Sequence, residues 1–322
     1  MHKVIMAPTE GSEKEMAAIS VAVKLAQRFD ADLHLVRAEA PPLVIETVGS
    51  PPVLAITEQT LLAERLARLR KLEALGNEYR AVGKVRVMTA LMDGPITSTL
   101  ADYATQHQVD LTVMSSHSRG GLKRITLGSV TDYLIRNTSI PVLVVRPPTS
   151  LIGATPEQAL SRIVVPLDGS ELAEQVLPEV AALASRFGST ISLLHVLTPE
   201  TYSQKQIMQP ALPWWDADMA LANSYLDEAA SDLTGQGLTV SKDVVLSDDI
   251  TSAILDYAAR TKADLVALAT RGKGGVSRLV FGSVADEITR RSATSLLVFH
   301  PKRSAAVEDP AARSEGQTLA GA

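Results

Sequence analysis

The chain repeats itself, and this repeat constrains its fold more than any other feature. VIMAPTEGSE at 4–13 parallels IVVPLDGSEL at 163–172, and ITSTLADYATQHQVDL at 96–111 parallels ITSAILDYAARTKADL at 250–265. The offset is roughly 154 to 158 residues, whereas the repeats of a solenoid run to about 50 residues. At about 150 residues per domain, a chain of 322 residues therefore holds two copies of one domain.

Each copy alternates short apolar runs with longer amphipathic stretches. The runs are rich in valine, leucine and isoleucine and nearly continuous, which is typical of parallel strands buried on both faces. Stretches such as EMAAISVAVKLAQRF have helical spacing. Each half is thus predicted to be an α/β sandwich with a five-stranded parallel sheet and right-handed crossovers. The expected strands are Val4–Ala7, Leu33–Ala38, Val85–Thr89, Leu111–Ser115 and Val142–Val145, then Ile163–Pro166, Ile191–Leu197, Val240–Leu246, Leu265–Ala269 and Leu296–Phe299.

The pattern is interrupted at the join between the halves and at the end of the chain. Proline and small residues dominate RPPTSLIGATPEQALSR at 146–162, so we expect domains at 1–149 and 160–302. Residues 303–322 lack apolar periodicity and are predicted to be a disordered tail. Insertions at 41–53 and 199–218 follow the second strand of each half. We expect the pair Trp214–Trp215 to pack the second insertion onto its domain, the alternative being a partner anchor.

Composition excludes several classes of function. The net charge of −5 gives no basic footprint for nucleic acid, and no apolar run approaches the ~20 residues of a membrane helix. The chain has no cysteine, and its histidines lack zinc-ligand spacing, so no structural metal is expected. No catalytic constellation is identified, and with no targeting segment the cytoplasm is the expected location.

A glycine-rich segment follows the fourth strand of each half. In the second half it reads ATRGKGGVSRLVFGSVADEI at 269–288, and its counterpart is SSHSRGGLKRITLGSVTDYL at 115–134. Glycines let backbone N–H groups approach an anion, and the N-terminus of the following helix favours negative charge. Ser283 is placed to cap that helix. Each piece taken alone is more typical of a turn followed by a capped helix than of a binding site.

The combination resembles the universal stress protein family, as a tandem of two domains covering nearly the whole chain. It consists of strand–Pro-x-acid–Gly–Ser at the start of each half, and Gly-x9-Gly-Ser after the fourth strand of the second half. The resemblance implies a Rossmann-like sheet of the adenine nucleotide alpha hydrolase type, with strand order 3-2-1-4-5. It also implies ATP as ligand, with Mg²⁺ held largely by the phosphates. In the second half the implied binding residues are Leu167, Asp168, Val196, Ala269, Arg271, Gly272, Gly275, Gly282, Ser283 and Val284.

The first half departs further from the family pattern, so the second half is favoured for ATP. Ala269 replaces one motif glycine in the second half, whereas Ser115 and Ser118 replace two in the first and Glu10 replaces the aspartate. The implied first-half residues are Thr9, Glu10, Ala38, Ser115, His117, Ser118, Arg119, Gly128, Ser129 and Val130.

Three functions remain open at this point. The first is an ATP-binding stress-response regulator that acts through conformation or partner binding, with at most slow hydrolysis. The second is an interaction module of the same fold that binds no nucleotide, and the third, least favoured, is a nucleotide-processing enzyme. The last strands, in IPVLVVRP and TSLLVFHP, are expected to pair the halves as an internal pseudo-dimer, with a homodimer of the whole chain as a further possibility.

Overall fold

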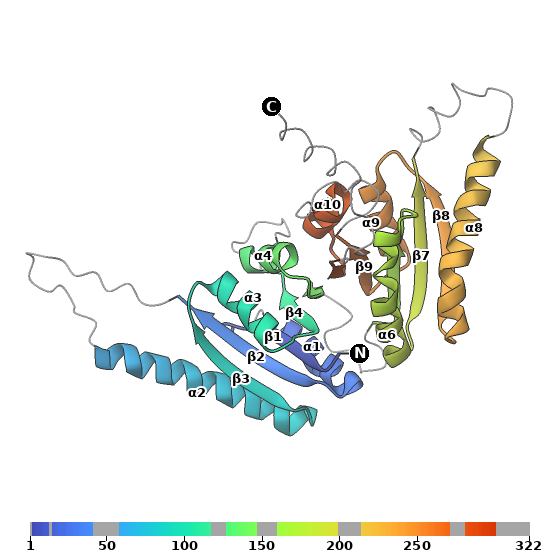
Figure 1. Cartoon of the computed structure of the whole chain (residues 1–322). Helices are drawn as coiled ribbons and strands as arrows, with labels where there is room; N and C mark the ends of the chain where they lie inside the picture. Colours follow the sequence, from blue (N-terminus) through green and yellow to red (C-terminus); the bar gives the residue numbers. More distant parts are fainter. Residues whose placement is uncertain are drawn as a thin grey trace, which may run out of the picture.

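A computed structural model describes residues 2–12, 15–40, 58–116, 127–146, 160–198, 214–270 and 281–300. Figure 1 shows that each half contains a sheet flanked by helices. The elements of the first half are β1 (Val4–Pro8), α1 (Met16–Phe29), β2 (Asp32–Glu39), α2 (Glu58–Gly83), β3 (Val87–Asp93), α3 (Ile96–Gln106), β4 (Leu111–Ser115), α4 (Ser129–Asn137) and β5 (Val142–Val145).

The second half repeats this order of strands and helices, with one short additional helix, α5 (Glu171–Glu174), after its first strand. Its elements are β6 (Arg162–Pro166), α5, α6 (Leu177–Phe187), β7 (Thr190–Leu197), α8 (Trp214–Gly235), β8 (Thr239–Leu246), α9 (Ile250–Arg260), β9 (Leu265–Ala269), α10 (Ser283–Arg291) and β10 (Ser295–Phe299). The side chains of Trp214 and Trp215 and the tail at 303–322 lie outside the described residues.

The strands form one ten-stranded sheet with the order β3-β2-β1-β4-β5-β10-β9-β6-β7-β8. Within each half, neighbouring strands run parallel in the predicted order 3-2-1-4-5, so the predicted fold is confirmed. β5 and β10 join the halves through antiparallel pairing, in which Leu143 lies opposite Leu297. Parallel strands joined by helical crossovers explain why the apolar runs were nearly continuous.

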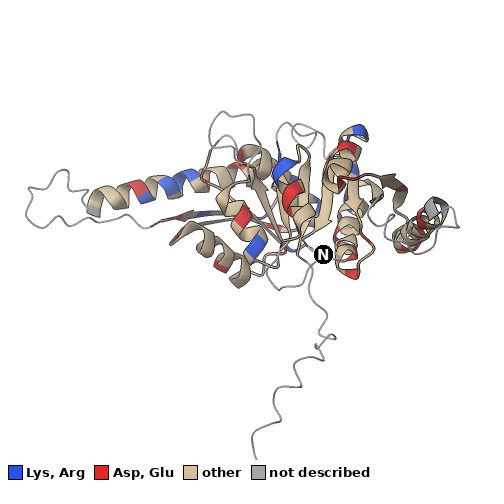
Figure 2. Cartoon of the chain, turned by 90° about the horizontal axis from the view of Figure 1, so that it is seen from above, with Lys and Arg blue, Asp and Glu red and all other residues tan. Residues whose placement is uncertain are grey.

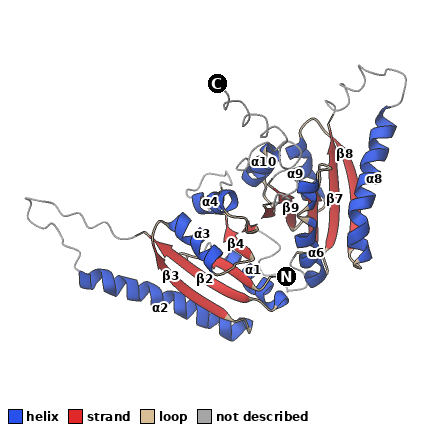
Figure 3. Cartoon of the chain, in the orientation of Figure 1, coloured by secondary structure: helices blue, strands red, loops and turns tan. Residues whose placement is uncertain are grey.

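Helices cover both faces of the sheet, and each face has its own apolar cluster (Figure 3). Alternate residues of β1 illustrate the division, because Ile5 packs in the cluster with α1 and α6, whereas Met6 packs in the cluster with α3, α4, α9 and α10. Lys and Arg segments alternate with Asp and Glu segments along the described helices (Figure 2). Among the described residues, no helix is both long and apolar enough to cross a membrane.

Nine of the ten predicted strands have bounds within one residue of the structure, whereas the third strand and one helix cap differ more clearly. The third strand was expected at Val85–Thr89 but runs from Val87 to Asp93, because its pairing with β2 continues to Glu39 opposite Asp93. Ser283 was expected to cap α10, which was wrong. The N-cap is Gly282, whose extended backbone (φ −61°, ψ 143°) places Ser283 in the first helical turn, and no side chain caps this helix.

We call the boundary where β5 pairs with β10 the seam between the halves. Contacts between helices also cross this seam. Arg28 lies 5.9 Å from the ring centroid of Phe187, and Arg186 lies 5.9 Å from that of Phe29. These pairs exchange counterparts, since Arg28 and Phe29 of α1 match Arg186 and Phe187 of α6 at an offset of about 158 residues. The contact is therefore reciprocal between the halves.

Candidate functional site

The carboxyl ends of β1, β2 and β4 meet at one edge of the first half. β1 pairs with β2 on one side and with β4 on the other, so the chain leaves β1 and β4 at neighbouring points of the same edge. Open α/β sheets bind ligands at such a point, where the strand order reverses.

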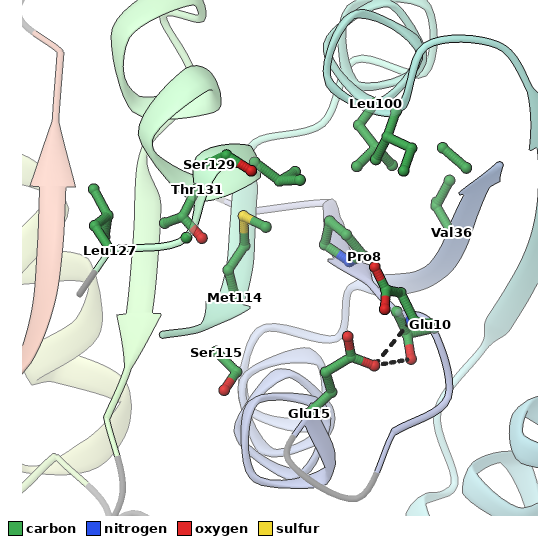
Figure 4. A pocket seen from close by; sticks show the side chains of 15 residues that line it. Pro8, Glu10, Glu15, Val36, Leu100, Met114, Ser115, Leu127, Ser129 and Thr131 are labelled. Atoms are coloured by element: carbon green, nitrogen blue, oxygen red, sulfur yellow. Dashed lines mark hydrogen bonds between the residues drawn. The ribbon is translucent and has the colours of Figure 1, made fainter. Parts of the chain in front are cut away.

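A cavity of about 340 Å³ lies at this edge (Figure 4). This volume falls within the range of sites for small molecules. The predicted first-half site residues that the structure describes all line it, namely Thr9, Glu10, Ala38, Ser115, Gly128, Ser129 and Val130. His117, Ser118 and Arg119 lie outside the described residues. The structure thus brings together, in one cavity, predicted residues that come from four separate segments of the sequence.

The cavity has an apolar wall contributed by strands and by two helices. Its members share aliphatic or thioether side chains and are Pro8, Val36, Ala38, Ile96, Leu100, Met114, Leu127 and Val130. Val36 and Leu100 are fully or almost fully buried, so their contacts hold this wall in place. A wall of this kind suits a flat, weakly polar ring rather than a charged group.

The N-terminus of α4 faces the same cavity. Gly128 is the N-cap residue, with φ −67° and ψ 149°, and no side chain caps the helix. Ser129, Val130 and Thr131 follow it along the cavity wall. The first N–H groups of a helix have no partner within the helix, and the helix dipole makes this end positive. This end of the cavity therefore suits an anion.

The loop between β1 and α1 forms the opposite side of the cavity. Gly11 has φ +80°, a conformation that a residue with a side chain rarely adopts. The carboxylate oxygen Oε2 of Glu15 accepts hydrogen bonds from the Thr9 hydroxyl (2.9 Å) and from the backbone N–H groups of Glu10 (2.9 Å), Gly11 (3.1 Å) and Ser12 (3.2 Å). One buried carboxylate thus holds residues 9–12 of this loop.

Glu10 lines the cavity beside this loop. Its carbonyl oxygen accepts a hydrogen bond from the Arg37 guanidinium, and Arg37 Nε in turn lies 2.6 Å from Glu39 Oε1. The Glu10 carboxylate has neither a hydrogen bond nor an ion pair with any residue that the structure describes. It is exposed, and so it is available to hydroxyl or amino groups of a ligand.

The second half places its predicted residues at the equivalent edge. Leu167 and Asp168 follow β6, Val196 lies near the end of β7, Ala269 ends β9, and Gly282, Ser283 and Val284 stand at the start of α10. Arg271, Gly272 and Gly275 lie outside the described residues.

The loop after β6 is held by different hydrogen bonds. Gly169 has φ +78°, like Gly11, but Oδ1 of Asp168 accepts from the backbone N–H (3.0 Å) and the hydroxyl (2.6 Å) of Ser170. Ser170 Oγ then accepts from the N–H of Ala173 at 3.2 Å, which caps α5. His195 Nδ1 donates to the carbonyl oxygen of Leu167 at 2.9 Å, because a carbonyl can only accept. This histidine lies near the carboxyl end of β7.

The sequence argument missed these lining residues: Pro8, Glu15, Val36, Ile96, Leu100, Met114, Leu127 and Thr131. Ile96 and Leu100 lie in the segment at 96–111, which the sequence argument used only as evidence for the repeat. Oε2 of Glu15 accepts from the backbone N–H of Ser12, which is one half of a capping box, and Ser-x-x-Glu before an apolar helix is a readable signal for it. The other half is not formed, because the Ser12 hydroxyl has no hydrogen-bond partner among the described residues. The described parts of the chain contain no cluster of three or more His, Cys, Asp or Glu side chains able to hold a metal ion.

The cavity lies on a sheet made of two repeated Rossmann-like halves, and comparison with known proteins gives the family. The model of the universal stress protein family matches residues 1–146 and again 160–300. The chain belongs to the universal stress protein family.

Individual relatives align with this chain over most of its length and most of their own. A universal stress protein of Mycolicibacterium smegmatis is 23% identical over 301 residues, covering 92% of this chain and 97% of the relative. One of Mycobacterium tuberculosis is 26% identical over 275 residues, covering 83% and 85%. The crystal structure of an Archaeoglobus fulgidus universal stress protein, at 14% identity, superposes with a TM-score of 0.66 over 92% of this chain and 98% of that chain. The last similarity supports the fold alone.

Proposed function

We propose that this protein binds ATP or a related adenine nucleotide and acts as a stress-response regulator through conformation or partner binding. The observation that carries the proposal is the first-half cavity. An apolar wall, the Glu10 carboxylate and the N-terminus of α4 lie around one space at the point where the strand order reverses. These three surfaces match the three parts of a nucleotide, namely base, sugar and phosphate.

Each part of the cavity has a distinct task in this proposal. The adenine ring packs on the wall that includes Val36, Leu100 and Met114. The sugar hydroxyls donate to Glu10. The phosphates take hydrogen bonds from the backbone N–H groups at Gly128, Ser129 and Val130. A Mg²⁺ ion, where present, is held mainly by the phosphates and water.

The second half is proposed to bind nucleotide in the corresponding way. Asp168 and Val196 take the nucleoside, while Gly282, Ser283 and Val284 take the phosphates, together with Arg271, Gly272 and Gly275. Leu167 and Ala269 border the same site. The support is that the described members of this set lie at or just after the carboxyl ends of β6, β7 and β9 or around the start of α10, and so share one edge of the sheet.

Regulation fits the cavity better than rapid catalysis does. The acidic residues that line the cavity are Glu10 and Glu15, and Glu15 is already engaged by the four donors of its own loop. Fast phosphoryl transfer requires a group that positions the attacking nucleophile and cations that stabilise the transition state. Glu10 lies at the sugar end of the proposed ligand, so hydrolysis is expected to be slow at most.

The two halves are further proposed to act as an internal pseudo-dimer in the cytoplasm. The support is the antiparallel pairing of β5 with β10, together with the reciprocal contacts Arg28–Phe187 and Arg186–Phe29. Association of whole chains into a homodimer is a separate question, which analytical ultracentrifugation with and without ATP would answer.

Isothermal titration with ATP and AMP tests the proposal. Ser129→Glu puts a carboxylate at the start of α4, where the helix dipole accepts it but a phosphate is repelled. This change should weaken ATP binding to the first half at least about tenfold, which is about 1.4 kcal/mol. Ser283→Glu is the matched variant for the second half. Absence of both heat and thermal shift at millimolar ATP would overturn the proposal in favour of an interaction module that binds no nucleotide.

A further inference from the structure

The two halves hold their first loops with different acidic residues. In the first half, Glu15 Oε2 accepts all four hydrogen bonds from Thr9, Glu10, Gly11 and Ser12, and the residue is only 6% exposed. At the same place in the second half stands Ala173, which has no side-chain acceptor. The loop after β6 must therefore be held by another group.

That group is Asp168, the residue at the Glu10 position. Its Oδ1 accepts two hydrogen bonds from Ser170, one from the N–H at 3.0 Å and one from the hydroxyl at 2.6 Å. Because Oδ1 is directed toward Ser170 of its own loop, it is less available to a ligand than a carboxylate oxygen without a partner. The Asp168 carboxylate thus serves two purposes, since one oxygen binds its own loop and only the rest of the group is left for the site.

We propose that Glu15 is a positioning residue for the first-half cavity. Because Glu15 accepts the hydrogen bonds of the loop, both carboxylate oxygens of Glu10 stay free to face the ligand. Figure 4 shows Glu15 and Glu10 together at the cavity. The glutamate at position 10 departs from the family aspartate, and Glu15 departs from its counterpart Ala173. These two differences depend on each other, because the carboxylate at position 10 can stay free only if another side chain accepts the hydrogen bonds of the loop.

This inference rests on the proposed nucleotide site and specifies its selectivity. A free carboxylate can accept from two neighbouring hydroxyl groups at once, and the sugar of a ribonucleotide carries two such groups side by side. A ligand that lacks one of them leaves one charge-assisted hydrogen bond unmade. The first half is therefore selective for ribonucleotides over deoxyribonucleotides, and the second half is less selective.

The experiment compares ATP with 2′-deoxy-ATP by isothermal titration of the full chain. Ser283→Glu provides the background in which the first half is measured, and Ser129→Glu the background for the second. The first half should prefer ATP by about tenfold or more. Glu15→Ala should bring that ratio near one, because Glu10 then turns to its own loop, as Asp168 does. Glu15→Gln retains an acceptor oxygen and should preserve most of the preference.

A second variant separates positioning from loss of the folded loop. The double change Glu10→Asp with Glu15→Ala reproduces the acid and alanine of the second half, so the loop should fold and bind ATP with the weaker selectivity of that half. An unchanged ratio in Glu15→Ala, with ATP still bound, would overturn the inference while leaving the proposed function intact. No ATP binding in either background would overturn both.

Discussion

The two halves have a tyrosine at the same position, on α3 and α9, but its hydroxyl has a different hydrogen-bond partner in each half. In the first half the hydroxyl of Tyr103 lies 3.0 Å from Nδ1 of His34, and His107 stacks on the tyrosine ring at a centroid distance of 4.1 Å. In the second half Tyr257, the counterpart of Tyr103, donates to a carboxylate oxygen of Asp243. Ser192 stands where the first half has His34.

The comparison separates what the fold requires from what it leaves free. A buried tyrosine hydroxyl requires a partner, since an unpaired one is destabilising by about 1–3 kcal/mol. His34 on β2 supplies it in one half, and Asp243 on β8 supplies it in the other. The apolar pattern is common to both copies, whereas the polar partners have diverged, so the halves share a scaffold and differ in chemistry.

The first loops follow the same rule. Glu15 holds one loop and Asp168 holds the other, although Gly11 and Gly169 have nearly the same positive φ. The backbone shape is thus preserved while its acceptor changes. If this comparison is right, changes at the seam should couple the stabilities of the two halves. Changes to the polar partners should alter the stability of one half at a time.

The largest effect is expected at the seam. Leu143 and Leu297 lie opposite each other in the β5–β10 pair, and both are buried. Each change to alanine should lower the free energy of unfolding by about 2–5 kcal/mol. Because the side chains are neighbours, the double variant should depart from additivity by about 0.5 kcal/mol or more. Urea unfolding followed by circular dichroism measures this, and Leu33→Ala combined with Leu297→Ala is the additive control. Additivity in the first pair would mean that the halves are energetically independent.

A smaller effect is expected at His34 and depends on pH. Burial lowers the pKa of His34 from its ordinary value, His107 lowers it further, and Asp32 partly opposes them. A group that resists protonation in the folded state destabilises the fold as the pH falls below its unfolded pKa of about 6.5. Each pH unit over which only the unfolded chain takes the proton lowers stability by about 1.4 kcal/mol.

The counterpart residue provides the variant. His34→Ser should remove this acid-dependent loss between about pH 6.5 and the lower folded pKa, even though the Tyr103 hydroxyl loses its acceptor. Thermal unfolding measured at intervals across this range checks it. Ser192→Ala is the control in the second half and should leave the pH profile as it is. A wild-type profile without the loss would refute the role of His34.

The sheet could be predicted almost completely from the sequence, and the reason is physical. Strands buried on both faces leave continuous apolar runs, and the repeat shows which runs correspond, so Leu111–Ser115 and Leu265–Ala269 were predicted with their observed bounds. The end of β3 was not predictable locally, because the pairing of Asp93 with Glu39 determines it. Long-range pairing leaves little trace in a short window of sequence.

The site was predicted where the two halves agree and missed where they differ. Comparing the copies singled out Gly128 and Ser129, which match Gly282 and Ser283. The same comparison passed over Glu15 because its counterpart is Ala173, and it passed over the Tyr103–His34 pair for the same reason. Polar partners of this kind emerge only when the fold brings distant residues within hydrogen-bond distance.

The smallest expected effect compares two arginines that are counterparts on α4 and α10. Arg136 reaches across the seam, where it lies 2.5 Å from Asp286 and 4.8 Å from the ring centroid of Phe281 (Figure 1 shows α4 beside α10). Arg290 pairs with Asp286 within its own helix, and its side chain is 63% exposed, against 32% for Arg136. Arg136→Gln should therefore lower stability by about 1 kcal/mol, and Arg290→Gln by no more than about 0.5 kcal/mol.

The pH dependence of this pair has a definite sign. Burial acts to raise the pKa of Asp286, but hydrogen bonds from Arg290 and Arg136 outweigh it and lower the pKa overall. The ionised carboxylate therefore stabilises the fold above its unfolded pKa of about 3.9, and this contribution is lost as the pH falls through the lower folded value. The difference between wild type and Arg136→Gln, measured by urea unfolding, should shrink as the pH is taken below about 3.9. Equal losses in Arg136→Gln and Arg290→Gln at neutral pH would show that the seam adds nothing to an ordinary helical ion pair.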